Sequence, residues 1–122
     1  MEPRCLEYEA TIVNLSGTIK RVTFPGSPNY ESIEKSDRPE TYWILVLERP
    51  ACVSADPKEP MNVAEARVVE VQLILRDYAK FEHLLGSRVM AKGKLMHKFT
   101  GHHHTLVLVQ AIEVRKIRDR HI

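Results

Sequence analysis

The first strand-like stretch of the chain, residues 8–24, changes face halfway along its length. The apolar side chains of Val13 and Ile19 share one parity, whereas Val22 falls on the other, and Gly17 interrupts the pattern. Because successive side chains of a strand point to opposite faces, this switch predicts a β-bulge or a bend near the glycine. A strand that bends in this way can belong to two sheets, which is the corner that a small barrel needs.

Four later segments also have the apolar patterns of strands. Residues 41–47 are apolar on both parities, which predicts a strand that is covered on both faces. Residues 68–75 and 88–97 alternate apolar and polar side chains, as half-buried strands do, and a fifth strand is expected from about 104 to 114. The two longer connections, 25–39 and 54–65, are polar loops.

Between the third and fourth of these strands, the apolar period changes from that of a strand to that of a helix. Tyr78, Phe81 and either Leu84 or Leu85 fall at helical spacing. Asp77 is placed to cap the first turn, and Gly86 supplies a stop. The sequence therefore predicts one short helix at this point.

The resulting order, β-β-β-α-β-β with a bent first strand, is that of the oligonucleotide/oligosaccharide-binding (OB) barrel. Closing the sheet removes the edges that five apolar strands would otherwise expose. A ferredoxin-like layout would need two crossover helices, and the pattern shows only one good helix. We therefore expect a mainly β protein, with a single five-stranded OB-like barrel domain over residues 1–122.

The two cysteines are placed where a disulfide could form. Cys5 precedes the first strand and Cys52 follows the second by a few residues. In an antiparallel hairpin, the start of one strand faces the end of the other. A bridge between them would stabilise the fold by about 4 kcal/mol in the chain-entropy model and would indicate an oxidising compartment. Two unrelated free thiols are the alternative.

Four of the six histidines lie within residues 97–104, around the expected turn between the last two strands. His102 and His104 would point to the same face of an extended chain, about 7 Å apart at their Cα atoms, and His97 could approach from the opposite strand. Imidazole nitrogens in this arrangement can bind Zn²⁺ or Cu²⁺ weakly. The alternative is a polar hairpin tip without metal, and no other cofactor is expected.

OB barrels bind ligands across strands two and three, between the loop after the first strand and the loop before the last. Here these loops are residues 26–38 and 97–104. Both contain more side chains than a tight turn requires. The candidate ligand contacts are Tyr30, Glu31, Phe99, His102, His103 and His104. Tyr30 and Phe99 could instead fold back as lids over the barrel ends.

Several stretches of the sequence carry a resemblance to a known family. They are residues 5–9 leading into 15–18, residues 24–33, and the Gly-His-His-His-Thr run within 101–108, with further positions in 39–43 and 50–53. In these stretches the chain resembles a bacterial family known only as a domain of unknown function. The resemblance implies an OB-like fold and export, sometimes as one module beside other envelope domains, and it implies no established activity. Leu106 departs from the family, in which proline is expected there.

Export and a disulfide together predict a periplasmic or secreted protein. Residues 1–4 lack the basic and apolar regions of a signal peptide. We therefore expect that the sequence does not include the signal peptide that export requires. No apolar run approaches the ~20 residues that are needed to span a bilayer.

The leading functional hypothesis is a non-enzymatic exported module that binds a protein, in an inhibitor or immunity-type role, or an envelope glycan. A single-stranded nucleic-acid binder is the alternative, because Lys92, Lys94 and Lys98 share one face of the fourth strand. Tyr42 or Trp43 could then stack on bases. A net charge of only +2 argues against this alternative, and the oligomeric state is left open.

An enzyme is not expected. Ser32, Asp37 and the histidines could be arranged into a triad on paper. No nucleophile-elbow, paired-carboxylate or phosphate-loop motif accompanies them.

Overall fold

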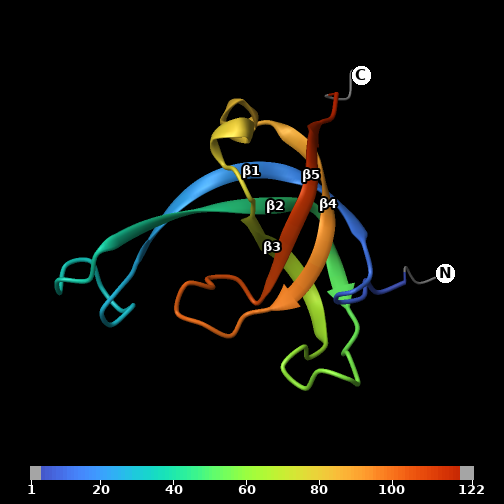
Figure 1. Cartoon of the computed structure of the whole chain (residues 1–122), viewed down its shortest axis with the longest axis horizontal. Coiled ribbons are helices and arrows are strands. Elements are labelled where there is room, and N and C mark those ends of the chain that lie inside the picture. The colour runs from blue at the N-terminus through green and yellow to red at the C-terminus, as the bar shows by residue number, and fades with distance from the viewer. Residues whose placement is uncertain (1–3, 119–122) are drawn as a thin grey trace.

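The computed structural model describes residues 4–118, which form a closed barrel (Figure 1). Its elements are β1 (Val13–Pro25), β2 (Pro39–Val53), β3 (Glu65–Ile74), the 3₁₀ helix η1 (Ala79–Leu84), β4 (Arg88–His97) and β5 (Val107–Lys116). Five strands, with one short helix between β3 and β4, confirm the predicted order. Within the described residues, no helix is long and apolar enough to cross a membrane.

The sheet closes where β3 and β5 run parallel. These two strands pair over Gln72–Ile74 and Leu108–Gln110. The other pairs, β1 with β2, β2 with β3, β4 with β5 and β1 with β4, are antiparallel. The order around the barrel is therefore β1-β2-β3-β5-β4, which is the arrangement of the OB-like barrel that the sequence predicts.

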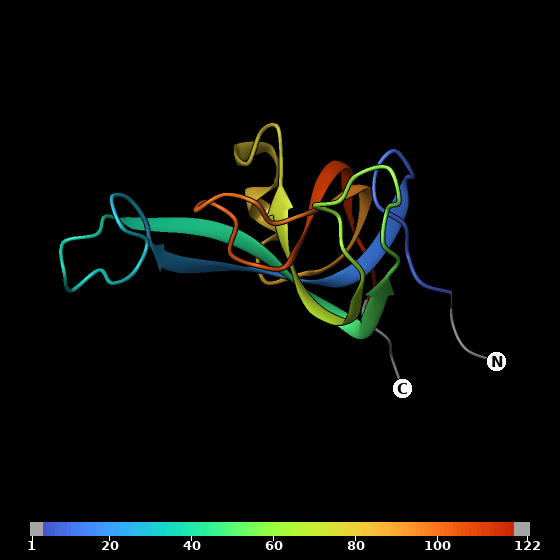
Figure 2. The ribbon, with the colours of Figure 1, turned by 90° about the horizontal axis from the view of Figure 1, so that it is seen from below.

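β1 curves along the barrel and serves both of its sides, as predicted (Figure 1), but neither of its ladders contains a register shift, so the strand has a bend and no β-bulge at Gly17. It pairs with β4 over Val13–Thr18 and with β2 over Gly17–Pro25. At the bend the two backbones come so close that a Cβ atom on Gly17 would overlap the carbonyl oxygen of Val46. Beyond the bend, the far half of the β1–β2 hairpin extends away from the barrel (Figure 2).

The core takes apolar side chains from every strand and from η1. Its most deeply buried members include Ile19, Leu45, Val71, Leu73, Val89, Leu95, Val107 and Val109. The alternation predicted for β3 holds at Val71 and Leu73, but Val69 is 47% exposed. The register between β2 and β3 shifts between Val46 and Ala51, close to this position, and the side chain of Val69 leaves the core face.

The short helix η1 differs in type from the prediction. It is 3₁₀, it follows Tyr78, and no side chain caps its first turn, so Asp77 does not act as expected. A segment of 6 residues without a cap is too short to sustain α geometry. Gly86 ends the segment with a φ of 80°, which confirms the predicted stop.

Four strands have different limits from those predicted: β1 begins at Val13 and not at residue 8, β3 spans Glu65–Ile74 and not 68–75, and β2 and β5 also differ. β2 continues beyond residue 47 to Val53, because its second half pairs with β3 and with the segment before β1. β5 begins at Val107 and not at 104, because Gln72 bonds His104 and Thr105 and holds them in a loop.

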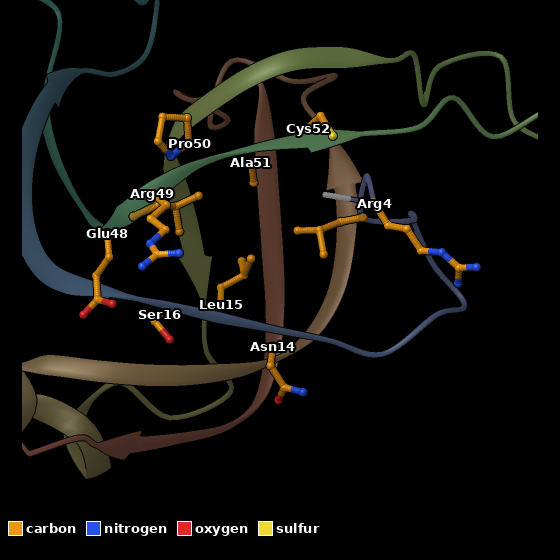
Figure 3. A pocket seen from close by; sticks show the side chains of 11 residues that line it. Arg4, Asn14, Leu15, Ser16, Glu48, Arg49, Pro50, Ala51 and Cys52 are labelled. Atoms are coloured by element: carbon orange, nitrogen blue, oxygen red, sulfur yellow. The ribbon is translucent and has the colours of Figure 1, made fainter. Parts of the chain in front are cut away.

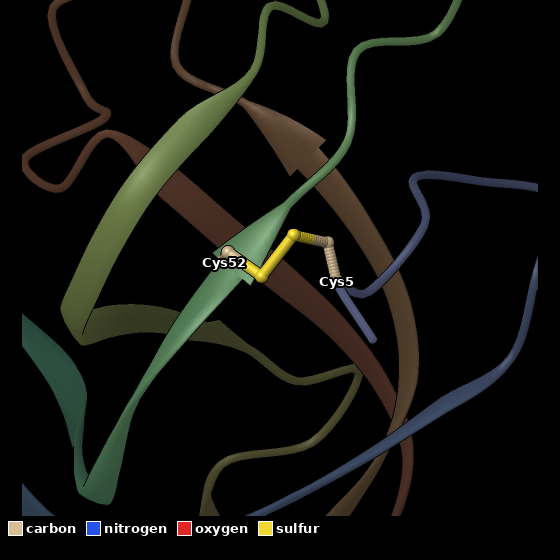
Figure 4. The surroundings of a disulfide bond; sticks show 2 residues. All are labelled: Cys5 and Cys52. Carbon is tan, nitrogen blue, oxygen red and sulfur yellow. A yellow bond between two sulfur atoms is a disulfide. The ribbon is translucent and has the colours of Figure 1, made fainter. Parts of the chain in front are cut away.

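The predicted disulfide joins Cys5 and Cys52 (Figure 4). Their Cα atoms are 4.6 Å apart, within the range that a disulfide requires. Beside it, the N–H of Leu6 donates to the carbonyl of Cys52 at 2.8 Å, and the N–H of Ser54 donates to the carbonyl of Leu6 at 2.9 Å. The bridge therefore holds the segment before β1 against the end of β2.

Candidate functional site

Three loops lie in a row along one end of the barrel (Figures 1 and 2). They are the hairpin loop (residues 26–38), the central loop (98–106) and the outer loop (54–64). The buried polar side chains of the described residues, Asp37, Asn62 and Gln72, are 3%, 6% and 4% exposed. Each of them bonds backbone in or beside one of these loops, so a buried polar side chain organises each loop.

Gln72 on β3 holds the central loop. Its side-chain nitrogen donates to the carbonyl of His102 at 3.0 Å, and its side-chain oxygen accepts from the N–H of His104 at 2.7 Å. Its backbone N–H donates to the hydroxyl of Thr105 at 2.8 Å, and that hydroxyl donates to the carbonyl of Val107. Because an amide side chain both donates and accepts, one buried residue can fix two peptide groups of the loop.

Asp37 holds the hairpin loop in the same way. One carboxylate oxygen accepts the N–H of Asn29 at 2.9 Å, and the other accepts those of Glu31 at 2.8 Å and Ser32 at 2.9 Å. The bonds from Ser32 and Glu31 are the main reason that the pKa of Asp37 lies below its ordinary value, since they stabilise the charged form. The loop is therefore folded around an ionised carboxylate.

The outer loop is joined to the end of β4. The side-chain oxygen of Asn62 accepts from the backbone N–H of His97 at 3.2 Å. The Nε2 atom of His97 lies 2.7 Å from the carboxylate of Glu65. The His97 ring also meets the buried ring of Tyr8 edge-on, and burial raises the pKa of the Tyr8 phenol to about 12.

His102 joins the central loop to β2 and to the hairpin loop. Its Nδ1 lies 2.9 Å from the hydroxyl of Tyr42 and 3.1 Å from a carboxylate oxygen of Glu40. Its Nε2 lies 3.3 Å from the hydroxyl of Tyr30, whose ring meets the imidazole edge-on at 5.4 Å. Since a carboxylate can only accept, we assign the proton of the neutral ring to Nδ1, and the hydroxyl of Tyr30 then donates to Nε2.

Glu40 and Tyr42 form the fixed end of this contact. The hydroxyl of Tyr42 donates to Glu40 at 2.5 Å. Hydrogen bonds from Tyr42 and His102 hold the pKa of Glu40 below its ordinary value, although burial acts in the opposite direction. Burial and the neighbouring Glu40 raise the pKa of Tyr42. At neutral pH a charged acceptor therefore faces a neutral phenol.

The other two histidines of the central loop pack on aromatic rings. His104 stacks on Phe24 of β1, with ring centroids 4.0 Å apart, and contacts Tyr42 at 4.6 Å. His103 accepts the backbone N–H of Phe99 at Nδ1, at 3.1 Å, and meets the Phe99 ring edge-on. Burial lowers the pKa of both imidazoles, so both are neutral at pH 7.

The three histidines predicted as metal ligands do not converge. His102 and His104 both contact Tyr42, whereas His97 is turned toward Glu65. Among residues 4–118, no group of three or more histidine, cysteine, aspartate or glutamate side chains could hold a metal ion. Zinc or copper binding by His97, His102 and His104 therefore stays a prediction, and no preformed set of ligands supports it.

The loops also expose large apolar side chains. Phe99 and Leu106 of the central loop are 57% and 52% exposed, and Met61 of the outer loop is 54% exposed. Met61 and Phe99 line one hollow of about 310 Å³. In the hairpin loop Tyr30 is half-buried against the central loop, and Glu31 beside it is exposed. Phe99 therefore does not fold back as a lid, whereas Tyr30 does pack inward.

Sequence reasoning assigned no site role to Glu40 and Gln72, which organise this surface. The segment Glu40-Thr41-Tyr42 carries a usable signal, because residues two apart on a strand share a face. Gln72 carries a weaker one: it is a polar residue that lies between two core residues of the strand, Val71 and Leu73. Its partners are backbone groups of a loop some 30 residues away, and no local pattern indicates them.

Residues 70–117 match the model of a family described as Domain of unknown function (DUF4431). The matched segment begins within β3 and includes Gln72, η1, β4, the central loop and all of β5. The match supports a family of unknown function for this part of the barrel. No curated protein matches the chain.

Proposed function

We propose that this protein is a non-enzymatic binding module, exported to the periplasm or the cell exterior, that recognises a protein or an envelope glycan. The binding surface is formed by the central loop, the hairpin loop and the part of β2 between them. If the partner is a protein, this module would act on it as an inhibitor or as an immunity-type protein.

The main support for the proposal is that hydrogen bonds fix the central loop in place. Gln72 bonds its backbone from the barrel wall, and His102 contacts Tyr30 and Tyr42 at its tip. The same loop leaves Phe99 more than half exposed. A loop that is ordered beforehand and displays an apolar anchor loses little conformational entropy on binding.

The exposed side chains favour a protein over a glycan. Phe99, Leu106 and Met61 are of the apolar kinds found at the centres of protein interfaces and at exposed patches that bind partners. Glu31 and His102 of the hairpin and central loops supply exposed polar groups, which an interface keeps at its rim. The same rings and carboxylates could also contact sugars, so a glycan is the second outcome that the test must separate.

The disulfide supports export. Bridges such as Cys5–Cys52 persist in oxidising compartments and are rare in the reducing cytosol.

The roles of the polar residues in the hairpin loop support binding without catalysis. Both oxygens of Asp37 are occupied by backbone N–H groups, and Ser32 supplies one of them. A carboxylate that organises its own loop is a poor orienting group for a catalytic base.

Single-stranded nucleic acid is the alternative ligand, and the surroundings of the rings count against it. Trp43 is 8% exposed and packs in the core, so it is not available to stack on bases. The rings of Tyr30 and Tyr42 remain, but Glu40 and Glu31 lie beside them. Negative charges at a stacking platform oppose the phosphate contacts on which such binding depends.

Photo-crosslinking from defined positions tests the proposal. A photoreactive phenylalanine analogue replaces Phe99 or Leu106 in the central loop, or Ile112 as the control. Ile112 is 65% exposed and lines a hollow with Phe81 of η1, at the other end of the barrel. The variants are exported to a bacterial periplasm and irradiated, and each adduct is identified by mass.

We expect the same adduct from positions 99 and 106 and none from position 112. A protein adduct supports the favoured partner, and a glycan adduct supports the second. Equal adducts from all three positions, or none from 99 and 106, would contradict the proposed surface. For nucleic acid, we expect no binding of a fluorescent oligothymidine tighter than about 10 µM at physiological salt. A tighter, salt-sensitive complex would favour the hypothesis of a nucleic-acid ligand over that of a protein or glycan ligand.

A further inference from the structure

β1 and β2 separate on the side of the barrel away from their hairpin. Their pairing ends at Gly17 and Leu47. Before Gly17, β1 pairs with β4, and beyond Leu47 the second half of β2 pairs with β3. Within the described residues, no strand fills the space between the two separated halves, and Figure 3 shows them diverging.

The N-terminal segment closes the wide end of this gap. Leu6 bridges to Val53 in parallel, and the disulfide between Cys5 and Cys52 ties the segment to β2. The two strands and this segment enclose a hollow of about 480 Å³, which we call the β1–β2 hollow. It shares no lining residue with the central or hairpin loop, so it is separate from the proposed binding surface.

The β1–β2 hollow is bordered by two strand edges. A strand directs backbone N–H and C=O groups alternately to its two edges, and an edge without a neighbour is a template for another strand. Residues 14–16 of β1 and 49–51 of β2 face each other across the hollow. Pro50 has no N–H to donate, so the β1 edge is the one that offers both donors and acceptors.

The charges that line the hollow are unbalanced. Arg4 and Arg49 are exposed there, and no ion pair joins either of them to an acid among residues 4–118. The acidic residue of the lining, Glu48, is paired with Arg88. Figure 3 shows Arg49 near the point where the strands separate and Arg4 at the opposite end. An extended ligand lying along the hollow would therefore meet a guanidinium near each end.

We propose that the β1–β2 hollow is a second binding site, which takes an extended acidic segment of a partner protein as an added strand on the edge of β1. Backbone bonds to residues 14–16 supply the affinity that is independent of sequence. Leu15 and Leu47 lie in the floor, where they meet alternate apolar side chains of the segment. Arg4 and Arg49 bind its carboxylates, which sets the preference for acidic residues.

A random dodecapeptide library selected on the disulfide-bonded protein tests this site. The parallel selection uses the double variant Arg4→Glu with Arg49→Glu. A matched control, Arg67→Glu with Arg115→Glu, makes the same change in net charge at exposed positions of β3 and β5. Circular dichroism first confirms that all three proteins are folded.

We expect the enriched peptides to alternate apolar residues with Asp or Glu. Their Kd should rise by at least about tenfold in the Arg4→Glu, Arg49→Glu variant, which corresponds to about 1.4 kcal/mol, and should change less than twofold in the control. Methylation of alternate peptide amide nitrogens should abolish binding, because it blocks the strand edge. In ¹⁵N–¹H spectra, the shifts should fall on residues 14–16 and spare 98–106.

Other results would overturn the proposal. An absence of enrichment would mean that Arg49 and Pro50 serve only to guard the edge against association. Basic peptides, undiminished binding to the Arg4→Glu, Arg49→Glu variant, or undiminished binding of the methylated peptides would each contradict an acidic strand. Shifts confined to the central loop would place the peptide on the first surface instead.

Discussion

The side-chain oxygen of Gln72, buried on β3, accepts a 2.7 Å hydrogen bond from the backbone N–H of His104 in the central loop. The side-chain nitrogen of the same residue donates to the carbonyl of His102. One residue of the barrel wall thus sets the position of the loop that displays Phe99. Loop order and binding should therefore change together when this residue is replaced.

Replacing Gln72 with Leu keeps the size of the side chain but removes both loop bonds. Because the peptide groups of His102 and His104 then lose their partners, we expect the free energy of unfolding to fall by about 1–3 kcal/mol. Amide exchange at residues 98–106 should accelerate more than exchange in the strands. Gln110→Leu, at an exposed position of β5, is the control and should change little. Unchanged protection of the central loop in Gln72→Leu would show that the anchor is not needed.

Replacing Asp37 with Ala should destabilise the protein in a pH-dependent way. The pKa of Asp37 in the folded protein lies below its ordinary value of 3.8. Its contribution is therefore fully present above that value and is lost as the pH falls through the folded pKa. Urea unfolding from pH 7 to pH 2 should show a stability difference from wild type that is constant above about pH 5 and shrinks in strong acid. Asp77→Ala, at a residue that caps nothing, should show no such profile; a pH-independent loss in Asp37→Ala would contradict the assignment.

Replacing His104 with Phe should make the protein less sensitive to mild acid. Burial holds the pKa of His104 below its ordinary value of 6.5, so folding favours the neutral ring. That contribution is present above pH 6.5 and is lost as the pH falls toward the folded pKa. A phenyl ring keeps the stack on Phe24 and cannot be protonated. We expect a smaller fall in melting temperature between pH 7.5 and pH 5 than in wild type, whereas His83→Ala on η1 should behave like wild type. An equal fall in melting temperature in His104→Phe and His83→Ala would contradict the assignment of this acid sensitivity to His104.

Replacing both Cys5 and Cys52 with Ser should lower the free energy of unfolding by about 4 kcal/mol, the loop-closure entropy for a separation of 47 residues. Denaturation with and without a reducing agent measures the same quantity in the wild type. Mass analysis after alkylation under non-reducing conditions checks the premise. Two alkylated thiols in protein taken from the periplasm would contradict both the bridge and the argument for export.

The barrel could be predicted because its determinants are local. The division of β1 between two partner strands around Gly17, the alternation along β4 and the stop at Gly86 were each indicated by neighbouring residues, and all are confirmed. The longer extent of β2 could not be predicted, because its second half is a strand only through pairing with β3 and the bridge to Leu6. The helix type depends on a cap that Asp77 does not supply.

The two loops of the site and their aromatic side chains could be predicted from the sequence. The hydrogen bonds that join these loops to the barrel could not. The OB-like order indicated that Tyr30 and His102 belong to neighbouring loops, and the structure places their side chains in contact. The expectation that the last strand begins at about residue 104 fails, because Gln72 holds residues 102–104 in a loop. As a result, His97 faces Glu65 and is not beside His102.

The central claim is that the protein binds its partner through the central loop. The most direct test is calorimetry of the species cross-linked at position 99, once identified, with the variants Phe99→Ser and Ile112→Ser. Both side chains are apolar and more than half exposed, at 57% and 65%, and the two substitutions have the same chemistry. We predict a Kd at least about tenfold weaker for Phe99→Ser, or about 1.4 kcal/mol, and a Kd within twofold of wild type for Ile112→Ser. Equal affinities for the two variants would contradict the account.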